Sequence, residues 1–257
     1  MIRLATILPI AYINKIDRSY DSQICMLLAH QALKSAKYLK IYKKRQKEGG
    51  YLILDNSAYE FGKAISNDLL FNVIKVAQPD EFVLPDAICD FKTTIKLTSN
   101  FLEKYNNEGK IKLMAVPQGK TIDEYIECYK YFSTNPLIDT IGLASKSTEL
   151  LPRINDYISG RHYVLETLIA KGLICKKPHH LLGLGDSGHH ELKVLKQYTF
   201  IRNCDSSAAY IHAKNGLVFN DKSYTKISEK IDFGDSYDEN VNYRLNINIS
   251  VLYNYAN

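Results

Sequence analysis

The chain has 257 residues, which is close to the ~250 typical of a single (β/α)₈ barrel and enough to bury a large core. Hydrophobic residues make up 46% of the sequence and charged residues 24%, as in ordinary soluble globular proteins. The apolar run Leu4–Leu8 is too short for a secretory signal, and no window approaches the ~20 apolar residues of a membrane span. We therefore expect a cytoplasmic protein without membrane contact.

The formal net charge of +5 permits a polyanionic partner without requiring one. It is carried by 26 lysines and 7 arginines, and lysine holds phosphate as a point charge rather than as a bidentate fork. The five cysteines contain no Cys-x-x-Cys pair, so the sequence predicts neither a disulfide framework nor a cysteine-rich zinc site. They are Cys25, Cys89, Cys128, Cys175 and Cys204.

Short apolar runs with strand character alternate with longer helical patterns along the chain. In chain order we predict a strand at Leu4–Leu8, a helix at Ser22–Lys47 ended by Gly49-Gly50, a strand at Tyr51–Leu54, a helix at Asn67–Val76, a strand at Phe82–Leu84, a helix near Asp90–Tyr105, a strand at Lys112–Val116, a helix from Thr121, a strand at Thr140–Leu143, helical sequence over Thr148–Leu173, a strand at His180–Leu184, a helix near Gly188–Lys196, a strand at Thr199–Asn203, a short helix at Ser206–Ala213 and an eighth strand at Leu217–Phe219.

Eight repeats of strand and helix in a chain of this length favour a closed α/β barrel over an open doubly wound sheet. The tail Asn240–Tyr255 fits a helix through Val241, Leu245, Ile249 and Leu252, and it fits a strand by alternation; we favour a closing helix. No linker or internal repeat divides the sequence. We therefore predict a single (β/α)₈ barrel domain over residues 1–257.

Acidic residues stand where three of the predicted strands end. Asp205 follows Thr199–Asn203, and a carboxylate there could act as a nucleophile at an anomeric carbon. The other interpretation is that Asp205 caps the helix that follows. Because parallel barrel strands all point toward one mouth, acids at successive strand ends are what an enzyme of this fold needs.

Asp55 and Asp86 are the other two strand-end acids. Asp55 could exchange a proton with a leaving base, or it could simply form an Asx-turn with Asn56 and Ser57. Asp86 could accept two parallel N–H bonds from a guanine-like edge, or it could serve a turn or a helix cap. These alternatives stay open at the level of sequence.

Glycines near the strand ends fit close approach to a flat ligand. Gln118 could donate to a carbonyl oxygen, and Gly119 and Gly142 would let backbone N–H groups approach it. Gly183 and Gly185 share this pattern, although glycine at a strand end often serves only the turn.

The histidines His179, His180, His189 and His190 could be metal ligands together with Cys175. Structural zinc usually needs four ligands in a closed site, and adjacent histidines seldom bind one ion together. We therefore predict no metal and no cofactor.

Taken in order, the clusters resemble the tRNA-guanine transglycosylase superfamily, and within it the phage branch that inserts 7-deazaguanines into DNA. The resemblance runs from residue 55 to residue 207, with a further similarity at Asn242-Tyr243-Arg244-Leu245. The matching pieces are Asp55-Asn56-Ser57-Ala58-Tyr59, Leu84-Pro85-Asp86, Pro117-Gln118-Gly119, Gly142-Leu143-Ala144, Leu181-Leu182-Gly183-Leu184-Gly185 and Asp205-Ser206-Ser207.

The resemblance implies an exchange of guanine for a 7-deazaguanine such as 7-cyano-7-deazaguanine, with retained configuration. It makes Asp205 the nucleophile and Asp55 the general acid and base. Asp86, Gln118 and Gly142 would read the guanine edge above Gly183. The remaining positions expected to bind substrate are Asn56, Ser57, Gly119 and Leu143. DNA and a free 7-deazaguanine base would be the partners, in a host cytoplasm if the source is a phage.

The tRNA enzymes of this superfamily carry a zinc subdomain with a Cys-x-Cys-x-x-Cys run, and this sequence has no cysteine after Cys204. We therefore expect a trimmed barrel without that subdomain. Two alternatives remain: exchange or hydrolysis at the level of free nucleotides, and a non-catalytic nucleic-acid-binding barrel.

Overall fold

The computed structural model describes residues 1–16, 23–105, 111–148, 151, 160–185, 188–220 and 224–257. Its strands are short and mostly buried. They are β1 (Arg3–Thr6), β2 (Ile24–Leu28), β3 (Tyr51–Asp55), β4 (Glu81–Val83), β5 (Lys112–Ala115), β6 (Thr140–Ala144), β7 (His179–Leu182) and β8 (Ile201–Ser206).

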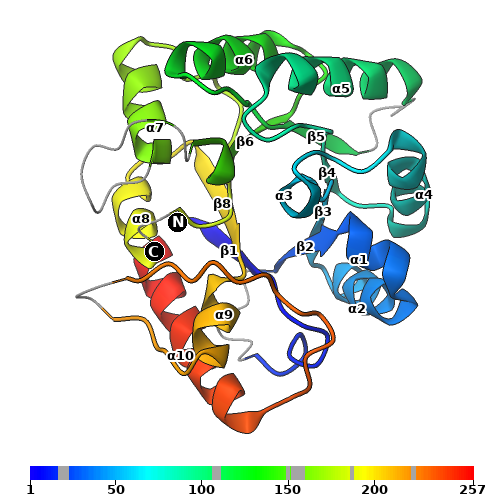
Figure 1. The fold of residues 1–257 in the computed structure, drawn as a ribbon, viewed down its shortest axis with the longest axis vertical. Coiled ribbons are helices and arrows are strands. Elements are labelled where there is room, and N and C mark those ends of the chain that lie inside the picture. Colours follow the sequence, from blue (N-terminus) through cyan, green and yellow to red (C-terminus); the bar gives the residue numbers. More distant parts are fainter. Residues whose placement is uncertain (17–22, 106–110, 149–150, 152–159, 186–187, 221–223) are drawn as a thin grey trace.

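Helices follow the strands and surround them (Figure 1). They are α1 (Ala29–Lys34), α2 (Ala36–Lys47), α3 (Ala58–Phe61), α4 (Asn67–Ala77), α5 (Phe91–Lys104), α6 (Ile122–Thr134), the 3₁₀ turn η2 (Lys146–Thr148), α7 (Gly160–Ala170), α8 (His189–Leu195), α9 (Ala208–Lys214) and α10 (Glu239–Ala256).

The strands form one parallel sheet rolled into a (β/α)₈ barrel, as the sequence predicts. Hydrogen-bonded neighbours run in the order β1-β8-β7-β6-β5-β4-β3-β2. β1 and β2, the two ends of that order, lie next to each other. No ladder joins them among the described residues, so the barrel is nearly closed. Parallel order brings the carboxyl ends of all the strands to one mouth.

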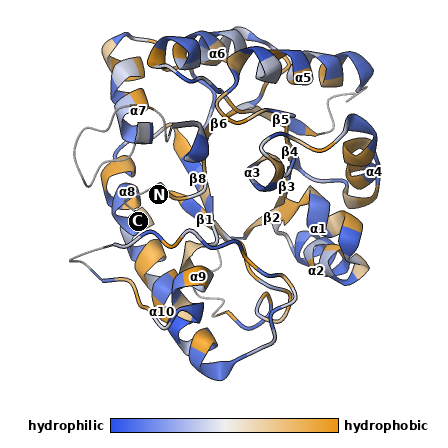
Figure 2. Ribbon diagram, in the orientation of Figure 1, coloured by the Kyte–Doolittle hydropathy of each residue, from blue (hydrophilic) through white to orange (hydrophobic). Residues whose placement is uncertain are grey.

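Burial on both faces explains why apolar residues dominate strands such as β2 and β3. All five residues of β2 are buried, between the barrel interior and the surrounding helices. Figure 2 shows hydrophobic residues along strands such as β2 and hydrophilic ones over much of the outer helix surface. The core is therefore one continuous cluster through the barrel and its helical shell.

The predicted helix Ser22–Lys47 is wrong in its first part. Ser22 lies outside the described residues, and Ile24–Leu28 is strand β2. A five-residue apolar run that continues into helix-forming sequence has no period of its own to distinguish strand from helix. The helical remainder breaks at Ser35, whose hydroxyl accepts a hydrogen bond from the Tyr38 N–H and caps α2.

The predicted eighth strand at Leu217–Phe219 is also wrong. These residues form no strand, and Leu217 and Val218 are exposed. The Phe219 N–H donates to Asn248 Oδ1 at 2.7 Å, which ties this segment to α10. The number of strands is still eight, because β2, which was predicted as part of a helix, is a strand and residues 217–219 are not.

Most helix predictions are confirmed with small changes of boundary. Asp90 caps α5 through the Thr93 N–H, Thr121 caps α6 through the Glu124 N–H, and the tail is the closing helix α10. Part of the helix predicted over Thr148–Leu173 lies outside the described residues; the rest contains α7. Within the described residues, every helix is too short or too polar to cross a lipid bilayer.

Candidate active site

The strand ends surround a cavity of about 380 Å³ at the carboxyl-terminal mouth of the barrel. This volume is in the range of small-molecule sites, roughly 300–1,000 Å³. The predicted acids Asp55, Asp86 and Asp205 all line it, from β3, from the loop after β4 and from β8. The fold therefore brings together carboxylates that are up to 150 positions apart in the sequence.

Asp205 lies inside β8 rather than after the strand, and it does not cap a helix. The residue at the N-cap position of α9 is Ser207, and the nearby Ala208 N–H donates to Ser206 Oγ. One carboxylate oxygen, Oδ1, accepts hydrogen bonds from His180 Nε2 at 3.0 Å and from the Gly183 N–H at 3.3 Å. The residue is 7% exposed, and it lines the cavity.

Asp55 forms the predicted Asx-turn and also faces the cavity. Its Oδ1 accepts the Ser57 N–H at 2.7 Å. Burial raises the pKa of Asp55 well above the ordinary value, and the nearby charges of Glu60 and Asp205 raise it further. The turn orients the carboxyl, and its surroundings favour the protonated form, which suits a proton donor.

Asp86 is buried beneath two side-chain amides. Asn56 Nδ2 donates to Oδ1 at 2.7 Å, and Gln118 Nε2 donates to Oδ2 at 2.6 Å. Burial raises the pKa of Asp86 to about 6, although these two hydrogen bonds oppose the rise. Gln118 Oε1 accepts the Cys89 N–H at 2.8 Å, which fixes the orientation of the amide. Asn56, Asp86 and Gln118 all line the cavity.

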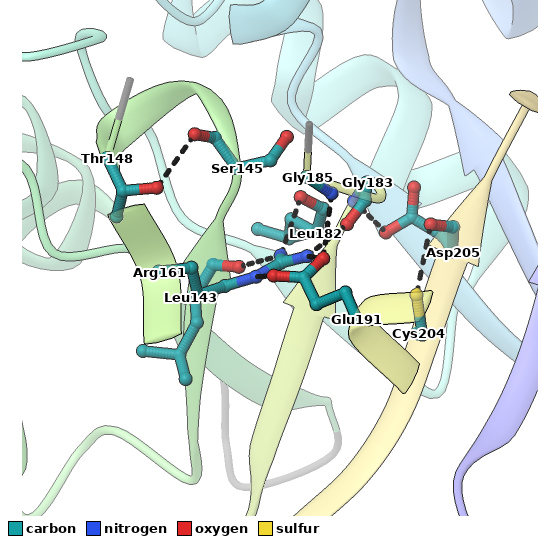
Figure 3. A network of polar contacts seen from close by, with 10 residues as sticks. All are labelled: Leu143, Ser145, Thr148, Arg161, Leu182, Gly183, Gly185, Glu191, Cys204 and Asp205. Atoms are coloured by element: carbon teal, nitrogen blue, oxygen red, sulfur yellow. Dashed lines mark hydrogen bonds and ion pairs between the residues drawn. The ribbon is translucent and has the colours of Figure 1, made fainter. Parts of the chain in front are cut away.

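The backbone of Gly183, just after β7, links Asp205 on β8 to Arg161 on α7 (Figure 3). Its φ of +69° lies in the left-handed region that favours glycine, and an added Cβ would meet Ser145 Oγ at 3.1 Å. In this conformation its N–H donates to Asp205 and its carbonyl oxygen accepts Arg161 Nη2 at 2.8 Å. Gly183 is among the residues that line the cavity.

Arg161 anchors the ends of β6 and β7 from α7. Its guanidinium forms a bidentate pair with Glu191, Nε to Oε1 at 2.9 Å and Nη2 to Oε2 at 2.5 Å, and Nη1 donates to the Leu143 carbonyl at 2.6 Å. Arg161 is 0% exposed. Glu191 Oε2 also accepts the Gly185 N–H at 2.7 Å. This buried network, drawn in Figure 3, holds the loop beside Asp205 in one shape.

Four of the residues expected to bind substrate do not line the cavity. The Ser57 hydroxyl is buried against His30 Nδ1 at 2.9 Å. A Cβ on Gly119 would lie 2.4 Å from the Tyr125 nitrogen, and one on Gly142 would lie 2.9 Å from Leu182 Cδ1. Leu143 is buried, and its carbonyl accepts Arg161. These residues shape the walls from behind, so direct contact with a base is not supported for them.

The mouth of the cavity combines aromatic, basic and acidic groups. Tyr59 is 53% exposed, and the Lys146 ammonium lies 5.9 Å from its ring centre. Three further lysines line the opening: Lys34, Lys226 and Lys230. The segment Tyr224–Phe233 (orange in Figure 1), which has no regular secondary structure, contributes seven lining residues. This segment therefore forms part of the cavity wall, together with lining residues from α9 such as Ala208 and Ile211.

No group of three or more potential metal ligands lies together in the described part of the chain. His179 contacts the Tyr129 hydroxyl at 2.9 Å, and His189 Nε2 lies 2.8 Å from the Asn220 carbonyl oxygen. His180 contacts Asp205. His179, His180 and His189 therefore have separate polar partners, and the His190 ring packs beside that of His189, with ring centroids 4.2 Å apart.

Sequence reasoning missed His180, Glu60 and the Arg161–Glu191 pair as parts of the site. Glu60 lines the cavity, and its buried Oε2 makes no hydrogen bond to any described residue. Burial raises the pKa of Glu60, although Lys230 lowers it. The signal that could have pointed to His180 is strand alternation, because it turns His180 into the barrel beside Asp205 on the neighbouring strand β8. No nearby sequence feature marks Arg161 or Glu191.

Comparisons with known proteins add little to this geometry. No family model matches the chain, and neither does any curated protein. Among solved structures, a citrate synthase variant, SbnG, is 13% identical, with 69% of this chain and 86% of that chain covered at a TM-score of 0.38. Similarity at this level carries no argument about function, so the function rests on the residues of the site.

Proposed function

We propose that this protein is a base-exchange transglycosylase that replaces guanine in DNA with a 7-deazaguanine through a covalent glycosyl-aspartate intermediate. The observation that carries the proposal is the convergence of three carboxylates with different surroundings in one cavity. Asp205 receives hydrogen bonds on one oxygen, burial raises the pKa of Asp55, and Asp86 is aligned by two amides. Three acids with such different surroundings suit three different roles: a nucleophile, a proton donor and a group that recognises the base.

In the first displacement an Asp205 oxygen attacks the anomeric carbon. The C–O bond forms as the bond from that carbon to N9 of guanine breaks, and the electron pair of the broken bond goes to the base. Asp55 gives its proton to a ring nitrogen of the departing guanine. The raised pKa of Asp55 supports this role, because burial and the neighbouring acids favour its protonated, proton-donating form.

The second displacement reverses these events with a new base. The ionised Asp55 takes the N9 proton of the incoming 7-deazaguanine, and N9 attacks the same carbon while Asp205 leaves as a carboxylate. Two inversions at one carbon retain the configuration. Protons and charges balance over the cycle, because Asp55 regains the proton that it gave.

Asp86 and Gln118 form the base-reading wall in this proposal. Each Asp86 oxygen accepts one amide N–H and keeps a lone pair for the N1–H or the exocyclic amine of guanine. Because Cys89 holds Gln118 Oε1, the second N–H of the Gln118 amide can donate to the base carbonyl. Adenine presents the opposite pattern of donors and acceptors, so this wall selects guanine-like bases.

The lysines at the mouth favour a phosphate-bearing substrate over a free nucleoside. The cavity holds about 380 Å³, so a duplex must present an unpaired or flipped nucleotide to it. A cavity of this size also suits a single nucleotide. Nucleotide-level exchange is therefore the second candidate, and the two differ only in substrate.

The test is incorporation of a labelled 7-deazaguanine into guanine-containing DNA, single-stranded and duplex, with deoxyguanosine monophosphate in a parallel reaction. We expect label in DNA with wild type and none with Asp205→Ala. The matched control is Asp123→Ala, which removes an exposed acid on α6. Label in the nucleotide alone would support the second candidate. Salt-dependent DNA binding without incorporation or adduct would make the protein a non-catalytic barrel.

A further inference from the structure

His180 lies against the proposed nucleophile in the barrel interior. It is on β7, next to β8 in the sheet, and its ring is 0% exposed. Nε2 lies 3.0 Å from Asp205 Oδ1. The Gly183 N–H donates to the same oxygen, and no described residue donates to the other one, Oδ2. Asp205 therefore has one held oxygen and one oxygen left for the cavity.

The second ring nitrogen of His180 fixes the protonation pattern. Nδ1 is buried and has no hydrogen-bond partner among the described residues. An imidazolium would bury an N–H donor at Nδ1 without an acceptor, which costs more than a buried lone pair in this position. The tautomer that suits both nitrogens carries its hydrogen on Nε2 and donates it to Asp205.

We infer that His180 is the positioning residue of Asp205: a neutral donor that holds Oδ1 and directs Oδ2 at the anomeric carbon. This inference rests on the proposed function. Oδ2 forms the bond to carbon as the base leaves, and His180 keeps its hydrogen throughout. In the resulting ester Oδ1 is the carbonyl oxygen and still accepts from Nε2. A neutral donor leaves the negative charge of Asp205 uncancelled opposite a cationic sugar transition state.

The neighbouring residue provides a matched control. His179 is on the same strand and is equally buried, but it packs outside the barrel, where Nε2 contacts the Tyr129 hydroxyl at 2.9 Å. A purely structural histidine in β7 should behave like His179. A positioning residue should change the rate of the covalent step and leave the binding of the free base intact.

The experiment compares His180→Leu, His180→Gln and His179→Leu with wild type. Gln keeps a donor nitrogen near the position of Nε2, whereas Leu removes it. We expect His180→Leu to slow single-turnover formation of the glycosyl-enzyme by about 10- to 100-fold, the usual effect of losing a hydrogen bond to a charged group. His180→Gln should recover most of this rate. His179→Leu should lower the melting temperature and keep the rate per folded molecule.

The dissociation constant of the free 7-deazaguanine should be the same in wild type and in both His180 variants. Equal single-turnover rates for His180→Leu and wild type would reject the positioning role and leave the transglycosylase proposal intact. Inactive wild type on both DNA and nucleotide would reject the proposed function itself. Long-range ¹H–¹⁵N spectra give a readout besides activity: we expect the Nε2–H tautomer of His180, and an imidazolium or an Nδ1–H tautomer would overturn the inference.

Discussion

The two sides of the cavity hold their carboxylates in opposite ways. On the β7–β8 side, Asp205 receives two donors, and the loop beside it is tied down by the buried Arg161–Glu191 pair. On the β3–β4 side, Asp55 and Glu60 lie among other acids, and burial raises the pKa of both. One wall supplies hydrogen-bond donors to its carboxylate, and the other favours the protonated form of its acids. In the proposed scheme, this division suits Asp205 to the role of nucleophile and Asp55 to that of proton donor.

Replacing Asp205 on the β7–β8 side should cause the largest loss of activity, because it removes the proposed nucleophile. In Asp205→Asn the shape and the His180 contact are largely kept, but the nucleophilic oxygen is lost. We expect kcat to fall by a factor on the order of 10³ or more, because the covalent route is closed. Steady-state incorporation of labelled base measures this, with Asp123→Asn as the surface control. Activity within tenfold of wild type would contradict the role of Asp205.

Replacing Asp55 on the β3–β4 side should lower the activity and change the dependence of the rate on pH. We expect Asp55→Asn to lower kcat by about 10²- to 10⁴-fold, the usual size of general acid–base catalysis. In wild type the rate of the first displacement should fall as pH rises through the raised pKa of Asp55, because the proton donor is then lost. That alkaline decline should vanish in the variant. A decline that persists unchanged would assign it to another group.

The rigidity of the β7–β8 side can be tested through its buried ion pair. Arg161→Met leaves the Glu191 carboxylate buried without its partner, and three carbonyl oxygens lose a donor. We expect a loss of about 3–5 kcal/mol in the free energy of unfolding. Chemical denaturation measures it. Adding Glu191→Met should return part of the loss, and a single variant as stable as wild type would show that the pair does not hold the loop.

The prediction for Asp86 is a modest change in affinity for the free base, and it depends directly on pH. Its carboxylate accepts from the base only when ionised, so affinity for the free base should weaken as pH falls through about 6, the pKa to which burial raises it. Calorimetric titration from pH 8 to pH 5 measures this. The linkage to folding has the opposite sign: a raised acid pKa makes the folded state more stable below pH 6 than above it. Asp86-linked unfolding therefore cannot explain weaker binding at low pH, and affinity that is constant over this range would contradict the base-reading role.

The sequence predicted the barrel and the three acids because both depend on local patterns. Short apolar runs ending in Asp55, Asp86 and Asp205 are visible without any long-range information. β2 was missed because Ile24–Leu28 continues directly into helix-forming residues. Leu217–Phe219 was mistaken for a strand because a short apolar run looks the same in the sequence whether its residues are exposed, like Leu217 and Val218, or buried, like Phe219.

The supporting residues could not be predicted in the same way. Arg161 and Glu191 are 30 positions apart, and nothing near either of them in the sequence marks it as buried. His180 carried a metal hypothesis because of its neighbour His179, yet strand alternation sends the two rings to opposite faces. Gly142 and Gly119 fit a ligand-approach pattern, but side-chain packing and a helix start explain them. Such roles emerge only from contacts across the closed barrel.

The central claim is that Asp205 forms a covalent bond to the sugar. The most direct test is to quench the reaction and measure the mass of the intact enzyme. With guanine-containing DNA and no incoming base, intact-protein mass spectrometry should find a covalent adduct between protein and DNA. Digestion should place the sugar on the peptide that contains Asp205, and Asp205→Asn should form none. Base exchange that proceeds with no adduct at Asp205 would show that the carboxylate on β8 never bonds to the sugar.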